Sequence, residues 1–401
     1  MEKEYVINKA RRFCGYIVGF VFYISGVLKL LDPVGAGLVM DEYFSFLHLG
    51  FLSFSSKTAG TLLALAESLI GAALITGVWR RITSRAAIIF QGFFTFMTLL
   101  LVIFNPEMDC GCFGEAIHLT HWQTFLKNII LLGLLAIYTA SPRLPSIRRP
   151  RKYVSFTIVA VSTTAFMIYS LVYIPLVDFT DFKPTARIAD AYQSDEEDMY
   201  EAIFTYEKDG KQEQFTLDNL PDSTWTFVST ETVAKNGKEE NTVNISVSDS
   251  EGAYQDHLLS TGKVMAVSVY RPQMNQDRWR RIADFIGNAS NEGFNVLILT
   301  PELPSDVLTY VPENIANVLK THLYHSDYKT LISMNRSNGG ITFFSDGYLI
   351  RKWSAVNTPD KEDLHEAATI SETEMLIGRS SQGSLIMQSF LLYVFAVMLL
   401  L

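Results

Sequence analysis

The sequence predicts a mainly α-helical membrane protein that carries a separate α/β domain outside the membrane. Three observations lead to this prediction: long apolar runs, a segregation of charge, and a polar region with a strand–helix rhythm. The 401-residue chain is 48% hydrophobic and only 19% charged, and its mean hydropathy is positive, at +0.17. This composition is unusual for a soluble enzyme and ordinary for a membrane protein. The length is sufficient for two or three domains.

Six apolar segments are candidates for membrane-spanning helices. A bilayer core about 30 Å thick needs roughly 20 apolar residues per helix. Five segments meet this requirement, namely residues 13–31, 58–78, 86–104, 122–140 and 153–176, and a sixth, 385–401, is shorter but nearly uncharged. We expect the first four to form a bundle over residues 13–142, and the fifth and sixth helices to flank an external domain of residues 177–384. No signal-peptide cleavage site follows the first run, so we interpret it as a retained anchor.

The basic residues orient the chain by the positive-inside rule. They precede the first span and fill the loops after the second and fourth spans, whereas residues 32–57 and 105–121 carry a single one, Lys57. We therefore place residues 1–12 in the cytoplasm, and the 105–121 loop and residues 177–384 on the outer, periplasmic side of an inner membrane. The basic residues of the two inner loops are Arg80, Arg81, Arg85, Arg143, Arg148, Arg149, Arg151 and Lys152.

The expected partners follow from this topology. The bilayer is one, and an exported or periplasmic protein is the other. Acidic residues concentrate after Pro175, in a chain whose formal net charge is −9, and no basic surface suited to nucleic acid is evident. An acidic run at 194–198 reads as a solvated loop.

The first outer loop contains a candidate interfacial helix. Residues 41–54 place Tyr43, Phe44, Leu47 and Phe51 at helical spacing. A connector that simply lies on the membrane surface is the plainer alternative.

The second half of the external region alternates strands and a helix. Residues 264–270 and 294–300 read as buried strands, and residues 277–290 between them read as an amphipathic helix. Residues 341–344 and 348–353 form a predicted hairpin around Ser345-Asp346-Gly347, a strong turn signal.

This order of elements, over about residues 261–354, resembles a thioredoxin-like domain. In that family a Cys-x-x-Cys motif follows the first of these strands, whereas the corresponding stretch here, Tyr270-Arg-Pro-Gln-Met-Asn-Gln276, has no cysteine. The family has a proline just before the hairpin, where this chain has Gly339-Gly340. The resemblance therefore implies a domain that presents or pairs with partners but exchanges no disulfides itself.

Several polar residues lie within the predicted spans. A charge at the centre of a bilayer costs roughly 2.5–3.5 kcal/mol on insertion scales, so such residues usually face the bundle and pair. We expect a polar cluster that could hold a quinone headgroup, a thiol substrate or a proton path. The alternative is that Lys29 and Lys127 reach the membrane surface and only Glu67 needs a partner. The candidate cluster comprises Lys29, Asp32, Glu67, Gln91, Lys127 and Asn128.

The loop between the third and fourth spans holds two of the three cysteines, Cys110 and Cys112. A thiolate is the reactive form of cysteine, and an oxidising external compartment favours disulfide chemistry. With one residue between them, the two cysteines would close a small, strained ring, and strained disulfides tend to be oxidising. We therefore interpret them as a candidate catalytic redox pair. Cys14, at the cytoplasmic end of the first span, reads as inert packing.

A metal site is the alternative interpretation of the same loop. Cys110, Cys112, His118 and His121 supply four nitrogen and sulfur ligands, which would suit zinc or copper. Their spacing matches no standard zinc signature. Structural cysteines without chemistry remain a third interpretation.

Several motifs resemble the DoxX-like superfamily, and most of all its methylamine-utilisation branch, MauE. They are Gly26-x-x-Lys29-Leu-x-Asp32-Pro33, Glu67 followed by Gly71, the arginines after the second span, Asp109-Cys-Gly-Cys-Phe-Gly114, and Trp122-x-Thr124 leading into Lys127-Asn128. The resemblance covers about residues 10–142 and implies a four-helix membrane bundle. It also implies a role in disulfide formation or maturation of exported partners, or quinone-coupled sulfur oxidation as in the DoxX branch.

Two functional hypotheses follow. The first is a membrane thiol–disulfide component acting through Cys110 and Cys112, with a quinone as candidate cofactor. The second is a non-enzymatic scaffold that presents a redox-inactive thioredoxin-like domain to envelope partners. The sequence leaves open whether the protein is an enzyme.

Overall fold

The computed structural model describes residues 2–140, 150–188, 200–208, 211–216, 225–234, 242–369 and 372–400. The chain divides into two compact units. The first comprises residues 1–180, 353–358 and 377–401, and the second comprises residues 181–352 and 359–376. The predicted acidic run at 194–198 and the arginines at 143, 148 and 149 lie outside the described residues.

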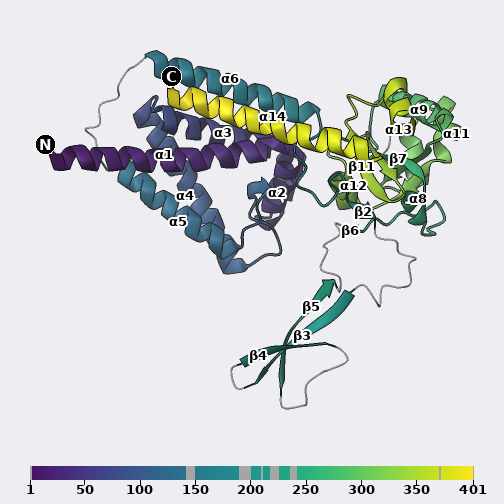
Figure 1. The fold of residues 1–401 in the computed structure, drawn as a ribbon, viewed down its shortest axis with the longest axis horizontal. Helices are drawn as coiled ribbons and strands as arrows, with labels where there is room; N and C mark the ends of the chain where they lie inside the picture. Colours follow the sequence, from purple (N-terminus) through teal and green to yellow (C-terminus); the bar gives the residue numbers. More distant parts are fainter. Residues whose placement is uncertain are drawn as a thin grey trace. The chain divides into compact units, whose positions relative to one another are not determined.

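The first unit is helical (Figure 1). Among its described residues, five helical segments are long and apolar enough to cross a membrane: Tyr5–Leu31, Gly50–Thr76, Arg80–Phe104, His121–Thr139 and Pro150–Val172. They correspond to the five long spans expected from the sequence. The sixth is a shorter apolar helix, Gly383–Leu399. The helices are α1 (Glu2–Leu31), α2 (Pro33–Phe46), η1 (Gly50–Ser55), α3 (Ser56–Thr76), α4 (Arg80–Phe104), α5 (His121–Thr139), α6 (Pro150–Val172) and α14 (Glu372–Leu400).

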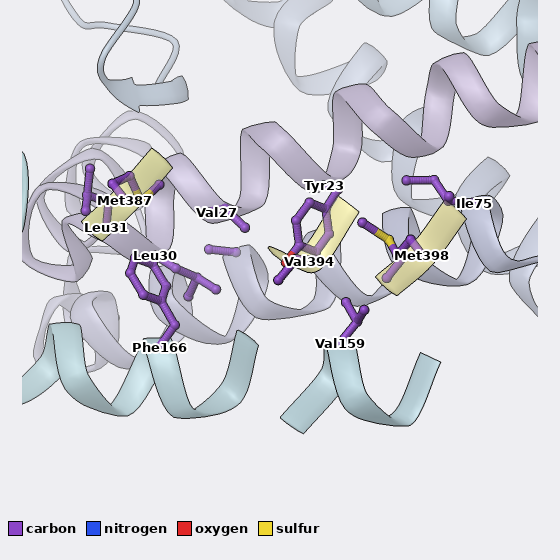
Figure 2. Close-up of a cluster of buried hydrophobic side chains, with 12 residues drawn as sticks. Tyr23, Val27, Leu30, Leu31, Ile75, Val159, Phe166, Met387, Val394 and Met398 are labelled. Carbon is purple, nitrogen blue, oxygen red and sulfur yellow. The ribbon is translucent and has the colours of Figure 1, made fainter. Parts of the chain in front are cut away.

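The fifth and sixth helices pack against the bundle through a shared apolar core. Val159 and Phe166 of α6 and Met387 and Val394 of α14 belong to one buried apolar cluster with Tyr23 of α1 (Figure 2). Polar bonds add to this packing, because the Ser155 hydroxyl donates to the Val397 carbonyl at 2.7 Å. The α6–α14 pair is therefore part of the helical unit, and Figure 1 shows the two helices side by side.

Small residues bring α1 and α3 close together. A Cβ at Gly71 would lie only 2.7 Å from the Gly19 carbonyl oxygen, so both positions are limited to glycine by the opposing backbone. This close approach brings Lys29 of α1 within reach of Glu67 of α3.

The interfacial helix predicted at 41–54 is wrong in its bounds. The helix α2 instead begins at Pro33, because the Asp32 carboxylate caps it by accepting from the Gly35 N–H at 3.0 Å. It ends at Phe46, and His48, with φ of 59°, breaks the chain direction before the short η1.

The second unit contains a seven-stranded sheet with the order β6-β2-β11-β10-β7-β8-β9. Strands β7, β8 and β9 are parallel, and β10 runs antiparallel to β7. The strands are β2 (Arg187–Ile188), β6 (Thr242–Val243), β7 (Lys263–Ser268), β8 (Asn295–Thr300), β9 (Leu323–His325), β10 (Gly340–Ser345) and β11 (Tyr348–Trp353). A separate three-stranded antiparallel sheet, not predicted, comprises β3 (Tyr200–Lys208), β4 (Lys211–Thr216) and β5 (Thr226–Ala234).

The predicted helix and hairpin of this unit are confirmed. The helix α9 (Gln276–Asn291) connects β7 to β8 and buries Trp279, Ile282 and Phe285. The β10–β11 turn has positive φ at both Asp346 and Gly347, as an Asp-Gly hairpin requires. The remaining helices are α8 (His257–Ser260), α10 (Pro304–Val307), η3 (Leu308–Tyr310), α11 (Glu313–Lys320), α12 (Tyr328–Met334) and α13 (Lys361–Thr369).

Candidate functional site

The cysteine loop is fixed at both ends by helix termini. Asn105 ends α4 in the left-handed conformation, which asparagine tolerates. At the other end, Thr120 and Gln123 form a capping box that starts α5 at His121. Between them, β1 (Cys112–Glu115) begins at the second cysteine. The loop is therefore an ordered structure on the helical unit.

Both loop cysteines are free thiols and both are buried, with 6% of Cys110 and 8% of Cys112 exposed. The Thr124 hydroxyl donates to the Cys110 sulfur at 3.0 Å. In its thiol form, Cys110 donates to the Leu119 carbonyl at 3.6 Å. Cys110 therefore has partners for both protonation states.

The two thiols interact with one another, and this makes them unequal. Interaction with the Cys112 thiol, together with the hydrogen bond from Thr124 and the charge of Lys127, lowers the pKa of Cys110. The same interaction, together with burial, raises the pKa of Cys112. Cys110 is therefore the more readily ionised thiol of the pair.

The loop backbone is clamped from two helices. The Ser25 hydroxyl of α1 donates to the Cys112 carbonyl at 2.5 Å, and the Tyr43 hydroxyl of α2 donates to the Cys110 carbonyl at 3.1 Å. Gly111 has φ of 59° and lies so close to Val39 that a Cβ there would collide with it. The glycine between the cysteines is therefore required both by its backbone conformation and by contact with α2.

An ion pair lies within the bundle near the loop. The Lys29 ammonium contacts Glu67 Oε2 at 2.6 Å, and the two side chains are only 13% and 9% exposed. Lys29 also donates to the Ser25 hydroxyl at 3.3 Å. Because Ser25 binds the Cys112 carbonyl, a chain of polar contacts runs from Glu67 to the loop. The alternative in which Lys29 reaches the surface is wrong, since Lys29 is itself the partner of Glu67.

The other members of the expected polar cluster lie in different contacts. The Gln91 amide donates to the Asn128 carbonyl at 3.1 Å, and the Asn128 amide donates to the Thr98 hydroxyl at 3.2 Å. The Lys127 ammonium lies 4.7 Å from the centre of the Phe113 ring. Asp32 caps α2. The six residues thus divide among several local contacts.

A cavity of about 130 Å³ lies directly beside the thiols. Cys110, Gly111, Cys112 and Lys29 line one part of it. The rest of the lining is mainly apolar and comes from α2, α3 and α4: Ala36, Val39, Met40, Tyr43, Phe44, Leu47, Gly60, Leu63, Phe93, Phe94 and Met97. The two thiols therefore form part of the wall of a mainly apolar cavity.

The ligand set of the metal alternative is not assembled. The His118 ring contacts the Asp109 carboxylate at 3.2 Å, and the His121 ring lies 2.8 Å from the Met108 carbonyl and 3.3 Å from Asn105 Oδ1. Within the described part of the chain, no group of three or more His, Cys, Asp or Glu residues is placed to hold a metal ion. Only the two cysteines of the proposed tetrad come together.

Three contributors to the site were not predicted from the sequence. Thr124, Ser25 and Tyr43 bind the cysteine loop, but hydroxyls on apolar helices commonly bond to their own helix, so their types alone do not point to a thiol.

Cys14 is a free, half-buried thiol of α1.

The apolar helices and the family match below identify the chain as a multi-pass membrane protein. Residues 7–141 match the family described as methylamine utilisation protein MauE, which confirms the predicted resemblance of this region to MauE. Residues 200–239, around the three-stranded sheet, match a family described only as a domain of unknown function.

One curated relative is similar over a limited stretch. Protein TlpB of Flavobacterium psychrophilum is 27% identical over 124 residues, which cover 30% of this chain and 33% of that protein. The match thus spans about a third of the length of the curated relative. No solved structure matched the chain.

Proposed function

We propose that the protein is a thiol–disulfide exchange component of the inner membrane, and that Cys110 and Cys112 are its redox pair. The observation that carries this proposal is a pair of free, buried thiols on one short loop, whose interaction lowers the pKa of one and raises the pKa of the other. Thiol–disulfide exchange requires such a thiolate beside a second thiol.

The exchange reaction uses both sulfurs. When the pair is oxidised, a thiolate of the partner protein attacks one of its sulfurs, breaks the Cys110–Cys112 bond and forms a mixed disulfide. A second thiolate of the partner then attacks the partner's own sulfur in the mixed disulfide, and the cysteine of this protein leaves. Both released cysteines take up a proton from water. The partner gains one disulfide, and Cys110 and Cys112 recover two thiols. Two electrons have passed from the partner to the pair.

The topology suggests where the partner comes from. The positive-inside rule puts the cysteine loop on the outer, periplasmic side, where disulfides persist. Residues 7–141 match MauE, and the resemblance to that branch implies a role in the maturation of exported partners. We therefore propose exported proteins as the substrates of the pair.

Mass-shift alkylation of membranes tests this function. Membranes are treated with a thiol-reactive polymer before and after reduction, in the wild type and in the Cys14→Ser variant. We expect a shift that appears only after reduction and depends on Cys110 and Cys112. A pair that stays fully reduced under oxidising conditions would exclude exchange.

A scaffold is the second candidate, and it is favoured by an observation on the second unit. There the partial strand order β8-β7-β10-β11, with β7 parallel to β8 and antiparallel to β10, is the arrangement expected of a thioredoxin-like domain. No cysteine occurs after Cys112, so such a domain would bind partners without exchanging disulfides. If scaffolding is the whole function, the double variant Cys110→Ser, Cys112→Ser retains full biological activity.

A further inference from the structure

The cavity beside Cys110 and Cys112 has the features of a ligand site. It joins a few polar groups, the two thiols and Lys29, to an otherwise mainly apolar lining. Small-molecule sites typically have this composition. A pair of cysteines that oxidises its partners must itself be reoxidised by an electron acceptor. The cavity next to the two thiols is in a position to bind that acceptor.

The size of the cavity limits what can enter. Its volume is about 130 Å³, whereas an apolar cavity of about 150 Å³ is known to bind benzene. The chamber therefore accommodates approximately one six-membered ring. A flavin or a nicotinamide dinucleotide is far too large to lie within it.

The lining favours a flat and uncharged ring. Tyr43 and Phe44 of α2 and Phe93 and Phe94 of α4 contribute aromatic surfaces, and aromatic rings pair favourably in stacked or edge-to-face arrangements. A charged acceptor would lose its hydration without enough polar partners in return.

Lys29 provides a directional contact for such a ring. Its ammonium carries three N–H donors. Its described hydrogen bonds use two of them, to Glu67 and Ser25. The third can donate to a ring carbonyl oxygen in the cavity that Lys29 lines.

The route of entry is also apolar. Phe93 and Leu47 line the cavity and are 51% and 36% exposed at the surface of the helical unit. On the same helix as Phe93, the side chains of Ile89 and Phe96 are 72% and 55% exposed. A ligand dissolved in the bilayer can therefore reach the cavity without crossing water.

We propose, building on the exchange function above, that this cavity binds the ring of a lipid quinone, which reoxidises the Cys110–Cys112 pair. The reduced pair, counted as two thiols, loses two electrons and two protons and forms one S–S bond. The quinone gains two electrons and two protons and becomes the quinol. Any fused ring or isoprenoid tail extends from the cavity toward the bilayer.

The test uses the reduced, full-length protein in lipid nanodiscs without oxygen. The probes are a short-chain benzoquinone and a short-chain naphthoquinone, both with fully substituted rings so that thiols cannot add to them. Quinol formation is followed by absorbance, and cysteine oxidation by mass-shift alkylation. We expect one quinol per oxidised pair with at least one probe. Comparison of the reaction rates with the two probes shows whether the cavity prefers a benzoquinone or a naphthoquinone.

Two matched variants locate the reaction. Met97→Trp fills the cavity from α4 and should slow quinone-driven oxidation by about tenfold or more, because the indole occupies the space of the ring. Ile82→Trp adds the same side chain to an exposed position of α4 outside the cavity lining and should leave the rate within about twofold of wild type. Both variants should still react with a small model disulfide.

The outcomes separate the two proposals. Reaction with the model disulfide but with neither quinone would refute the cavity proposal and leave the exchange function intact. Reaction with neither kind of oxidant would refute the exchange function itself. Equal quinone rates in wild type and Met97→Trp would show that the ring binds elsewhere.

Discussion

The two units of this protein each bury a cation against a carboxylate, but they do so in different surroundings. In the helical unit, Lys29 pairs with Glu67 at 2.6 Å beside an apolar cavity and two thiols. In the sheet unit, Arg351 of β11 pairs with Asp363 of α13 at 2.8 Å and joins a strand to a helix. A buried pair costs desolvation that its attraction only partly returns. The Arg351–Asp363 pair connects two packed elements of the sheet unit. The Lys29–Glu67 pair instead lies next to two thiols, which are groups that can react.

The cysteines divide the units even more sharply. All three lie in the helical unit, and the sheet unit has none. Any thiol chemistry of this chain must therefore occur in the helical unit. The predictions below test this division, beginning with the variants expected to have the largest effect.

Replacing either loop cysteine should abolish exchange. Cys110→Ser and Cys112→Ser each remove one sulfur of the pair, and we expect exchange with a model disulfide to fall by roughly a hundredfold or more. Cys14→Ser, in the same unit but in α1, should leave the rate unchanged. A Cys112→Ser variant that retained full turnover would show that Cys110 acts alone.

Removing the cation should cost more in the helical unit than in the sheet unit. Lys29→Met leaves Glu67 buried without its partner, and we expect a loss of about 3–5 kcal/mol in the free energy of unfolding. Arg351→Met should cost less, about 1–3 kcal/mol, because Asp363 is 26% exposed and regains hydration. Denaturant unfolding of both variants in the same detergent measures the difference.

A double variant distinguishes stability from function at the same pair. Lys29→Met combined with Glu67→Leu removes both charges and should recover most of the lost stability. It should not recover quinone-driven oxidation, since the donor to the ring is still missing. Equal recovery of both properties would assign the pair a purely structural role.

Adding a side chain at Gly111, between the two cysteines, should displace the loop. At Gly111, φ is 59° and a Cβ would meet Val39, so Gly111→Ala should cost about 1–2 kcal/mol locally. We expect faster alkylation of Cys112, because the loop no longer covers it. The companion variant Val39→Ala in the Gly111→Ala background relieves the collision and should restore part of the protection, while the backbone strain persists.

The sequence predicted the parts of the structure that depend on local patterns or on the cost of burying charge. The hairpin at Asp346-Gly347 follows from turn chemistry, and the Lys29–Glu67 contact follows from the need of a membrane charge for a partner. The start of α2 was missed because Asp32 was assigned to the polar cluster, although Asp-Pro is a helix-start signal. Thr124 was missed because its bond to Cys110 depends on how the loop folds back over α5.

The smallest effect should come from Thr124, and it tests which cysteine is the thiolate. Thr124→Val removes the hydroxyl that donates to the Cys110 sulfur at 3.0 Å. A hydrogen bond to a charged group stabilises it by about 1.5–3 kcal/mol, so the pKa of Cys110 should rise by about one unit or more. The midpoint of the pH profile for Cys110 alkylation should therefore move to higher pH. The rate should fall several-fold below that midpoint and recover above it, where the thiolate forms in either protein. Thr124→Ser keeps the donor and should retain the wild-type profile, whereas an unchanged profile in Thr124→Val would mean that contact with Cys112 alone sets the reactivity of Cys110.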